Sequence, residues 1–113
     1  MVSILESIKI LCGIFSEDEA FDNELIMHIN AALGILTQLG IGPNTGYLIS
    51  NVANVWTEFL PNTDPNFSIV KNYVYTKVRL IFDPPQNSFL VKALEDRLKE
   101  LEWRIELNAS IRV

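Results

Sequence analysis

Cysteine and histidine, the usual nucleophiles, bases and zinc ligands, are scarce in this sequence. Its 113 residues include one cysteine, Cys12, and one histidine, His28. A lone cysteine forms no internal disulfide, so a reducing compartment is the default. One histidine and one cysteine cannot assemble the usual ligand set of a zinc site. Cys12 as a nucleophile would need His28 as its base, and a buried small side chain is the better interpretation. We therefore predict a protein that is not an enzyme and has no catalytic residue, metal or cofactor.

Long apolar runs are also missing. The longest, residues 31–36, is far shorter than the roughly 20 residues that span a bilayer. Residues 1–14 are interrupted by Glu6 and Lys9 and lack the basic start and cleavage site of a signal peptide. We expect a product of the cytoplasm with no membrane partner.

Basic residues are in the minority. The chain has nine lysines and arginines and 14 aspartates and glutamates, which gives a net charge of −5. This balance argues against a freestanding nucleic-acid binder. Residues 1–24 hold six acids and one lysine, whereas residues 65–82 hold Lys71, Lys77 and Arg79 and no acid. Three cations neutralise few phosphates, so we expect this basic stretch to pair with acids of another helix or subunit.

What the sequence does have is apolar content, at 49%, against 20% charged residues. That content supports a packed core and one domain. A mean hydropathy of +0.20 is high for so short a chain, whose surface stays largely unburied when monomeric. Part of the apolar surface is therefore expected to meet partners.

Apolar periodicity predicts an all-α fold, a small bundle of about four to five helices. Ser16–Glu19 has the spacing of a capping box, and Asp64-Pro65 offers a cap with proline at the first helical position. Asn87 or Ser88 is the predicted cap of the last helix. The expected helices cover residues 3–11, 17–39, 50–60, 65–82 and 88–107. We expect one helical domain over residues 1–107 and a short C-terminal tail over 108–113.

A helix-breaking turn at Asp83, Pro84 and Pro85 separates the two long C-terminal helices. Each of these helices has a main apolar stripe, and the stripes contain Phe67, Val70, Val74, Val78 and Ile81, and Leu90, Leu94, Leu98, Leu101 and Ile105. Each also has apolar residues away from its stripe. These second faces are Ile69, Tyr73 and Leu80 on one helix and Phe89, Trp103 and Leu107 on the other. Burial of a central helix on several sides and contact between subunits both explain a second face.

Two stretches resemble a known family. One is Phe21–Leu25, followed by Ile29–Leu33 and Gly40. The other runs from Val70 through Arg79-Leu80-Ile81-Phe82-Asp83-Pro84-Pro85 to Glu102-Trp103-Arg104. Both are similar to the head–tail connector proteins, also called head completion or neck adaptor proteins, of long-tailed bacteriophages. The resemblance covers about residues 16–107 and is absent from residues 41–66.

The resemblance implies a structural virion protein of the phage neck, made in the host bacterial cytoplasm. Such subunits form a ring, commonly twelvefold, beneath the portal protein. The ring extends the DNA channel, through which the genome passes without sequence-specific binding, and offers a platform for the next neck or tail-completion protein. On this interpretation the second faces are candidate contacts between subunits. Candidate interface residues are Ile69, Tyr73, Leu80, Phe89, Trp103 and Leu107.

The C-terminal tail is a further candidate contact. Ile111 and Val113 alternate with polar residues, so residues 108–113 either dock on the portal as an extended strand or form a frayed end. The alternative function that the residues leave open is a small cytosolic helical module, outside any phage, that binds or regulates another protein.

Overall fold

The structure is a computed structural model that describes the backbone of residues 3–111 and the side chains up to Asn108. Its helices, in chain order, are α1 (Ile4–Leu11), α2 (Asp22–Gln38), α3 (Trp56–Phe59), α4 (Phe67–Phe82) and α5 (Ser88–Ile111). Within the described residues the only β contact is an isolated antiparallel bridge between Ser3 and Val55. The predicted all-α fold with two long C-terminal helices is confirmed.

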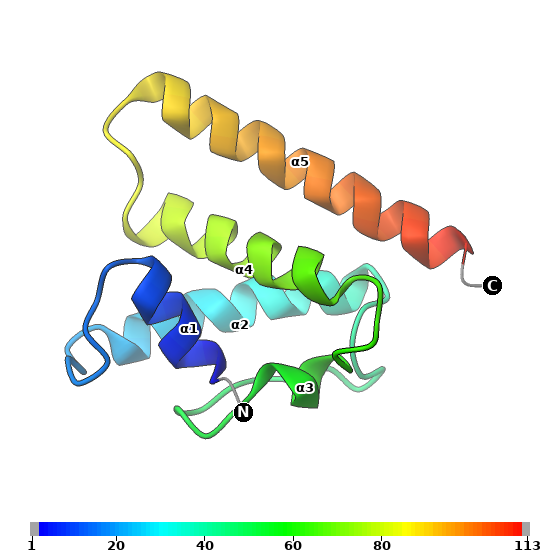
Figure 1. The fold of residues 1–113 in the computed structure, drawn as a ribbon, viewed down its shortest axis with the longest axis horizontal. Coiled ribbons are helices and arrows are strands. Elements are labelled where there is room, and N and C mark those ends of the chain that lie inside the picture. The colour runs from blue at the N-terminus through cyan, green and yellow to red at the C-terminus, as the bar shows by residue number, and fades with distance from the viewer. Residues whose placement is uncertain (1–2, 112–113) are drawn as a thin grey trace.

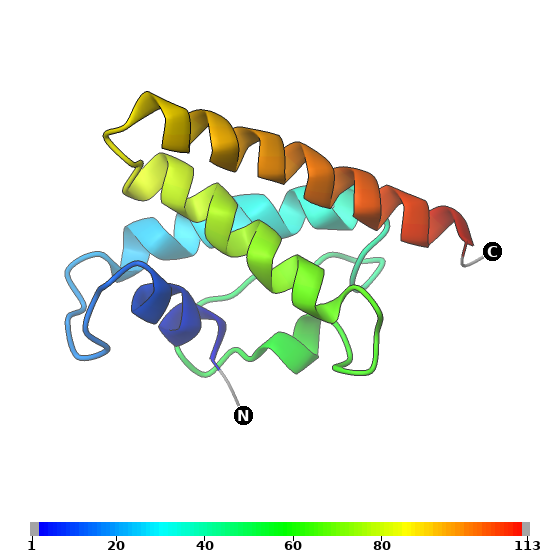
Figure 2. The same ribbon diagram turned by 45° about the horizontal axis from the view of Figure 1, so that its top comes forward.

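The helices stack in layers with α4 in the middle. Helix α2 packs against one side of α4 and α5 against the other, while α1 packs against α2. Figures 1 and 2 show α5 as the edge layer and the irregular segment that contains α3 on the opposite side of the molecule. The dimensions are 42 × 35 × 20 Å, so the domain is flat.

The predicted stripes are buried only in part. Val70, Val74 and Val78 of α4 are fully buried, and Ile105 of α5 is too. Near the turn that joins the two helices, however, Ile81 and Leu90 are each 53% exposed. The stripes are therefore covered where the helices lie far from their connection and uncovered beside it.

One of the three predicted helix caps, Asn87, is confirmed and the other two differ, while an unpredicted cap, Ser3, begins α1. At α1 the Ser3 hydroxyl accepts a hydrogen bond from the Glu6 N–H at 3.2 Å. At α5 the Asn87 side chain accepts one from the Phe89 N–H at 2.8 Å. Helix α4 begins at Phe67, not at residue 65, because the Asp64 carboxylate accepts from the Asn66 N–H at 2.8 Å and forms a turn before the helix.

The capping box predicted at Ser16–Glu19 is wrong, and a buried lysine explains why. The Lys9 side chain is fully inaccessible to solvent, and its ammonium donates to the carbonyl oxygens of Ser16 at 3.0 Å and Asp18 at 2.6 Å. It also pairs with the Asp22 carboxylate at 2.8 Å. Since the carbonyl groups turn inward to solvate this charge, residues 12–21 form a loop and α2 begins only at Asp22.

The segment between α2 and α4 is held by side chains rather than by regular structure. The Asn30 side chain bonds both backbone groups of Ile49, donating to its carbonyl at 3.0 Å and accepting from its N–H at 2.8 Å. The Trp56 indole N–H donates to the Ser7 hydroxyl at 2.9 Å. These bonds tie the segment to α1 and α2, so it covers the core without a long helix.

The helix predicted over residues 50–60 is wrong except at α3. The Asn54 side chain accepts from the Ser50 N–H at 2.8 Å, and the Asn51 side chain accepts from the Ala53 N–H at 2.7 Å. Asparagine side chains that bond nearby backbone compete with helix formation. Helix starts only after them, where Glu58 accepts from the Val55 N–H at 3.1 Å.

Gly42 is expected to be the least replaceable glycine of this segment. Its φ is +83°, and a Cβ atom there would lie 2.6 Å from the ring of Phe59. Gly46 has a similar φ of +85° with no atom near its Cβ position, so it is a matched control. Both Gly→Ala variants should lose about 1 kcal/mol from backbone strain, and Gly42→Ala about 1–3 kcal/mol more from overpacking. Urea denaturation measures both losses, and equal losses would contradict the close contact.

Lys9→Met should destabilise the fold strongly because it leaves the Asp22 carboxylate and two inward carbonyl groups without their cation. We expect a loss of about 3 kcal/mol or more in the free energy of unfolding. Lys92→Met is the control, since Lys92 forms an exposed ion pair with Asp96 at 3.2 Å, and should change stability by less than about 0.5 kcal/mol. The double variant Lys9→Met/Asp22→Leu should recover part of the loss. Similar denaturation midpoints for Lys9→Met and Lys92→Met would refute the role of Lys9.

Candidate assembly surfaces

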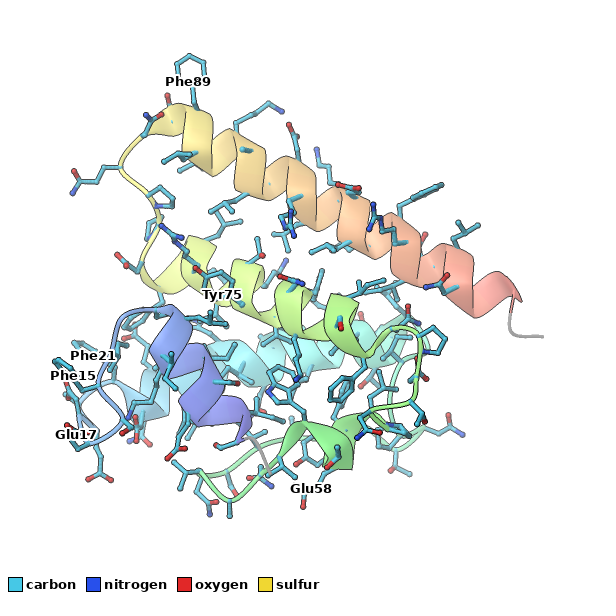
Figure 3. The ribbon with its side chains drawn as sticks, in the orientation of Figure 1. Phe15, Glu17, Phe21, Glu58, Tyr75 and Phe89 are labelled. Atoms are coloured by element: carbon cyan, nitrogen blue, oxygen red, sulfur yellow. The ribbon has the colours of Figure 1, made fainter. Side chains whose placement is uncertain are left out.

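Helix α5 presents three large apolar side chains to solvent on the side opposite its buried residues. Phe89 is 83% exposed, Trp103 61% and Leu107 42%. We call these three residues the outer face of α5; Figure 3 shows Phe89 projecting from the first turn of the helix. Between them lie the ion pairs Lys92–Asp96 and Glu100–Arg104, at 3.2 Å and 2.9 Å. An exposed helix face with apolar residues at both ends is typical of an interaction surface.

Tyr73 does not belong to an exposed face, and its prediction as a subunit contact is wrong for this fold. It is fully buried, because α4 is covered by α2 on one side and α5 on the other. Its hydroxyl donates to the Glu102 carboxylate of α5 at 2.8 Å. Burial and this hydrogen bond raise the pKa of Tyr73 well above its ordinary value. Ile69 and Leu80, the other second-face residues of α4, are half-buried and pack against the core.

The helix-breaking turn predicted at residues 83–85 separates α4 from α5, whereas the extended tail predicted over residues 108–113 differs from the structure. Helix α4 ends at Phe82 with Asp83 as its C-cap, and Pro84 and Pro85 lie in the link to α5. At the C-terminus, α5 continues to Ile111, so an extended tail that starts at residue 108 is wrong for residues 108–111. The Asn108 side chain donates to the Asn66 side chain at 2.7 Å and ties this end of α5 to the start of α4. Val113 lies outside the described residues.

A second exposed surface was not predicted. It consists of the end of α1 and the loop that follows, where Ile10 is 68%, Leu11 54%, Phe15 77% and Phe21 42% exposed. The ring of Phe21 also meets that of Phe82 edge-on, with centroids 5.3 Å apart. Glu17, Asp18 and Glu19 are exposed in the same loop. We call residues 12–21 the acidic loop; Figure 3 shows Phe15 and Glu17 pointing away from the helices.

One signal for this surface is present in the sequence. Phe15 stands between Gly13 and a polar run and fits no helical stripe, so no core position accounts for it. The sequence does not indicate that Ile81 and Leu90 are exposed, because both fit the periodicity of a buried stripe. Their exposure follows from how far the helices overlap, which periodicity does not specify.

A groove lies between α4 and α5 on the side of Lys77 and Leu80. It has a volume of about 290 Å³ and both apolar and charged walls. Its lining residues are Lys77, Leu80, Ile81, Glu95, Leu98, Lys99 and Glu102. We call it the α4–α5 groove. Ile81, at the exposed end of the α4 stripe, meets solvent there beside Leu98 of the α5 stripe.

Within one copy, the basic stretch of α4 contacts aromatic residues and not acids of another helix, whereas pairing with acids of another subunit stays a prediction. The Lys71 ammonium lies 4.4 Å from the centroid of the Phe67 ring and 6.0 Å from that of Trp56. Arg79 donates to the Tyr75 hydroxyl at 3.0 Å. Within the described part of the chain, Lys77 and Lys99 form no ion pair. Two cations of the groove are thus available to a partner.

The described residues offer little catalytic chemistry. His28 lies 3.9 Å from the Glu24 carboxylate of its own helix. Burial, together with the nearby Asp83 carboxylate, raises the pKa of the Cys12 thiol, which disfavours the thiolate. Over residues 3–108, three or more potential metal ligands do not gather in one place. No described helix combines the length and the apolar composition needed to cross a membrane.

Comparison with models of known protein families gives a match. The family model described as "Phage connector protein" matches residues 4–111, which is nearly the whole chain. No curated protein matches the chain. No solved structure matches it either.

Removal of Trp103 should leave the monomer intact. Because Trp103 is 61% exposed, Trp103→Ala should change the free energy of unfolding by less than about 0.5 kcal/mol. Ile105→Ala, two residues away on the buried side of α5, should cost about 2–5 kcal/mol. Chemical denaturation of both variants at low protein concentration checks this difference. A comparable loss for Trp103→Ala would mean that the outer face of α5 supports the monomer core.

Proposed function

The chain belongs to the phage connector family, and on that premise we propose that it is a ring-forming subunit of the phage neck. The proposed ring, commonly twelvefold in the proteins that the sequence resembles, lies beneath the portal protein and joins the capsid to the tail. It extends the channel through which the genome leaves the capsid. The subunit would act by assembly and not by catalysis.

The observation that carries this proposal is the exposure of large apolar side chains on two separate surfaces. One is the outer face of α5, and the other surrounds Phe15 on the acidic loop. A closed ring requires two different contact surfaces on each subunit, because every copy touches a neighbour on either side. Exposed aromatic residues are favoured anchors of such contacts. Phe89, Trp103 and Leu107, with the half-buried Ile69 and Leu80, remain the proposed interface residues of the predicted set.

The charge of the chain suits a channel that holds DNA loosely. With a net charge of −5, the subunit repels phosphate groups on average. A ring of such subunits would let the genome slide without specific binding. For the portal contact we propose the C-terminal end of the chain, which includes Ile111 and Val113. Over residues 108–111 this end is the last turn of α5 and not a strand.

Purified protein tests the proposal through its mass and its partners. Light scattering should give a multiple of the 12.8 kDa chain mass, and negative-stain images should show closed rings. Mixing with the portal protein of the same phage should give a stable complex in which the ring caps the portal. A chain that stays monomeric at every concentration and ignores the portal would refute the proposal and favour a regulatory module instead.

A further inference from the structure

We propose that the acidic loop of one copy docks into the α4–α5 groove of the next copy, with Phe15 as the apolar anchor. This inference rests on the proposed ring and names its contact. Each copy then offers a loop to one neighbour and a groove to the other. The occupant of the groove is a second copy of this chain.

The acidic loop is exposed and yet held in one shape. Phe15 is 77% exposed, so the monomer gains little from its ring. The buried Lys9 ammonium fixes the loop through the carbonyl oxygens of Ser16 and Asp18, at 3.0 Å and 2.6 Å. A loop that is ordered before binding loses less conformational entropy when it docks. Phe15 therefore lies on a loop that is already ordered before it binds a partner.

The α4–α5 groove offers matching apolar surface. Ile81 is 53% exposed and lines the groove together with the half-buried Leu80 and the nearly buried Leu98. At about 290 Å³ it is close to the size of a small ligand pocket. An aromatic ring placed there would cover Ile81, the end of the α4 stripe that the monomer leaves in water.

Charges on the two surfaces favour the same pairing. Glu17 and Glu19 of the loop have no basic partner among the described residues, because Lys9 is engaged with Asp22. Lys77 and Lys99 of the groove have no acidic partner there. Unpaired acids on one surface and unpaired lysines on the other are complementary.

The groove also holds two carboxylates, which limit this attraction. Glu102 accepts the Tyr73 hydroxyl at 2.8 Å and is directed toward the core by that bond. Glu95 has no such bond and is exposed beside the lysines, so it opposes an acidic loop. Glu95 is therefore the groove residue whose neutralisation should tighten the contact.

The outer face of α5 is a weaker acceptor for the loop. Lys92 and Arg104 there are already paired with Asp96 and Glu100 along the helix. Their charges are satisfied within one copy and offer less to the acids of another. Phe89, Trp103 and Leu107 of that face therefore add apolar area to a subunit contact whose specificity comes from the loop and the groove.

Loop and groove are separate surfaces, and they approach each other only where Phe21 at the end of the loop contacts Phe82 beside Ile81. In Figure 1 the loop follows α1 at one end of the domain, whereas the groove is bounded by α4 and α5. They share no residue, so one copy uses both at once. A contact between two different surfaces repeats from copy to copy and yields a ring where the rotation closes.

Mixing two defective variants tests the contact. Phe15→Ser disables the loop and Ile81→Glu disables the groove; both residues are exposed, so both variants should fold. Each variant alone should be monomeric, and an equal mixture should give a heterodimer and nothing larger, because each pair has one intact loop and one intact groove. Leu48→Ser is the matched control, since Leu48 is 69% exposed elsewhere, and should assemble like the unmodified chain. Native mass spectrometry reads out all four samples.

Charge variants give an independent arm of the same experiment. Glu95→Gln should lower the concentration needed for assembly, whereas Lys77→Glu should raise it about tenfold or more. Glu17→Lys combined with Lys77→Glu in one chain should restore part of the loss. Loss of stability in either variant would raise the protein concentration needed for assembly. A decrease for Glu95→Gln together with an increase for Lys77→Glu would therefore not follow from a merely structural role.

The outcomes separate this contact from the ring itself. Rings formed by Phe15→Ser or by Ile81→Glu alone would overturn the loop-in-groove contact and leave the proposed function standing. Failure of the mixture to give a heterodimer would also overturn it. An unmodified chain that never self-associates would overturn both the contact and the ring, and portal binding would then decide whether the connector role survives.

Discussion

The ammonium of Lys9 is fully buried, and much of the molecule follows from satisfying it. A buried cation is tolerated only when anionic or carbonyl oxygens surround it, and here they come from Ser16, Asp18 and Asp22. To supply two of them, the chain must wrap around the end of α1 before α2 begins. That wrap leaves no room for the helical turn that the local sequence favours, and it places Phe15 on the outside.

The middle position of α4 imposes a second constraint, which explains why two similar patterns have different outcomes. Tyr73 on α4 and Trp103 on α5 both lie away from the main stripe of their helix. Helix α4 has neighbours on two sides, so Tyr73 is enclosed and bonds Glu102 across the interface. Helix α5 is an edge layer with α4 as its main neighbour, so Trp103 faces solvent.

The sequence predicts the structure correctly where local periodicity and packing agree, as at Val70, Val74 and Val78 of α4 and at the Asn87 cap. It was unreliable where a distant group decides the backbone, as at Ser16, whose carbonyl is recruited by Lys9. Periodicity identifies two faces on a helix, but the order of layers decides which of them is covered. Periodicity also says nothing about loop residues, and for that reason the exposed surface around Phe15 was not predicted.

A chain this short has too few layers to cover both faces of its longest helix. Among residues 3–111, no further helix packs on the second side of α5, so its outer face is exposed. The apolar groups left in water at Phe15, Ile81 and Trp103 are then a standing cost of the monomer. In the proposed ring, neighbouring subunits remove that cost, because each copy supplies the layer that the next one lacks. In the proposed ring, the exposure that destabilises the isolated subunit is the driving force of assembly.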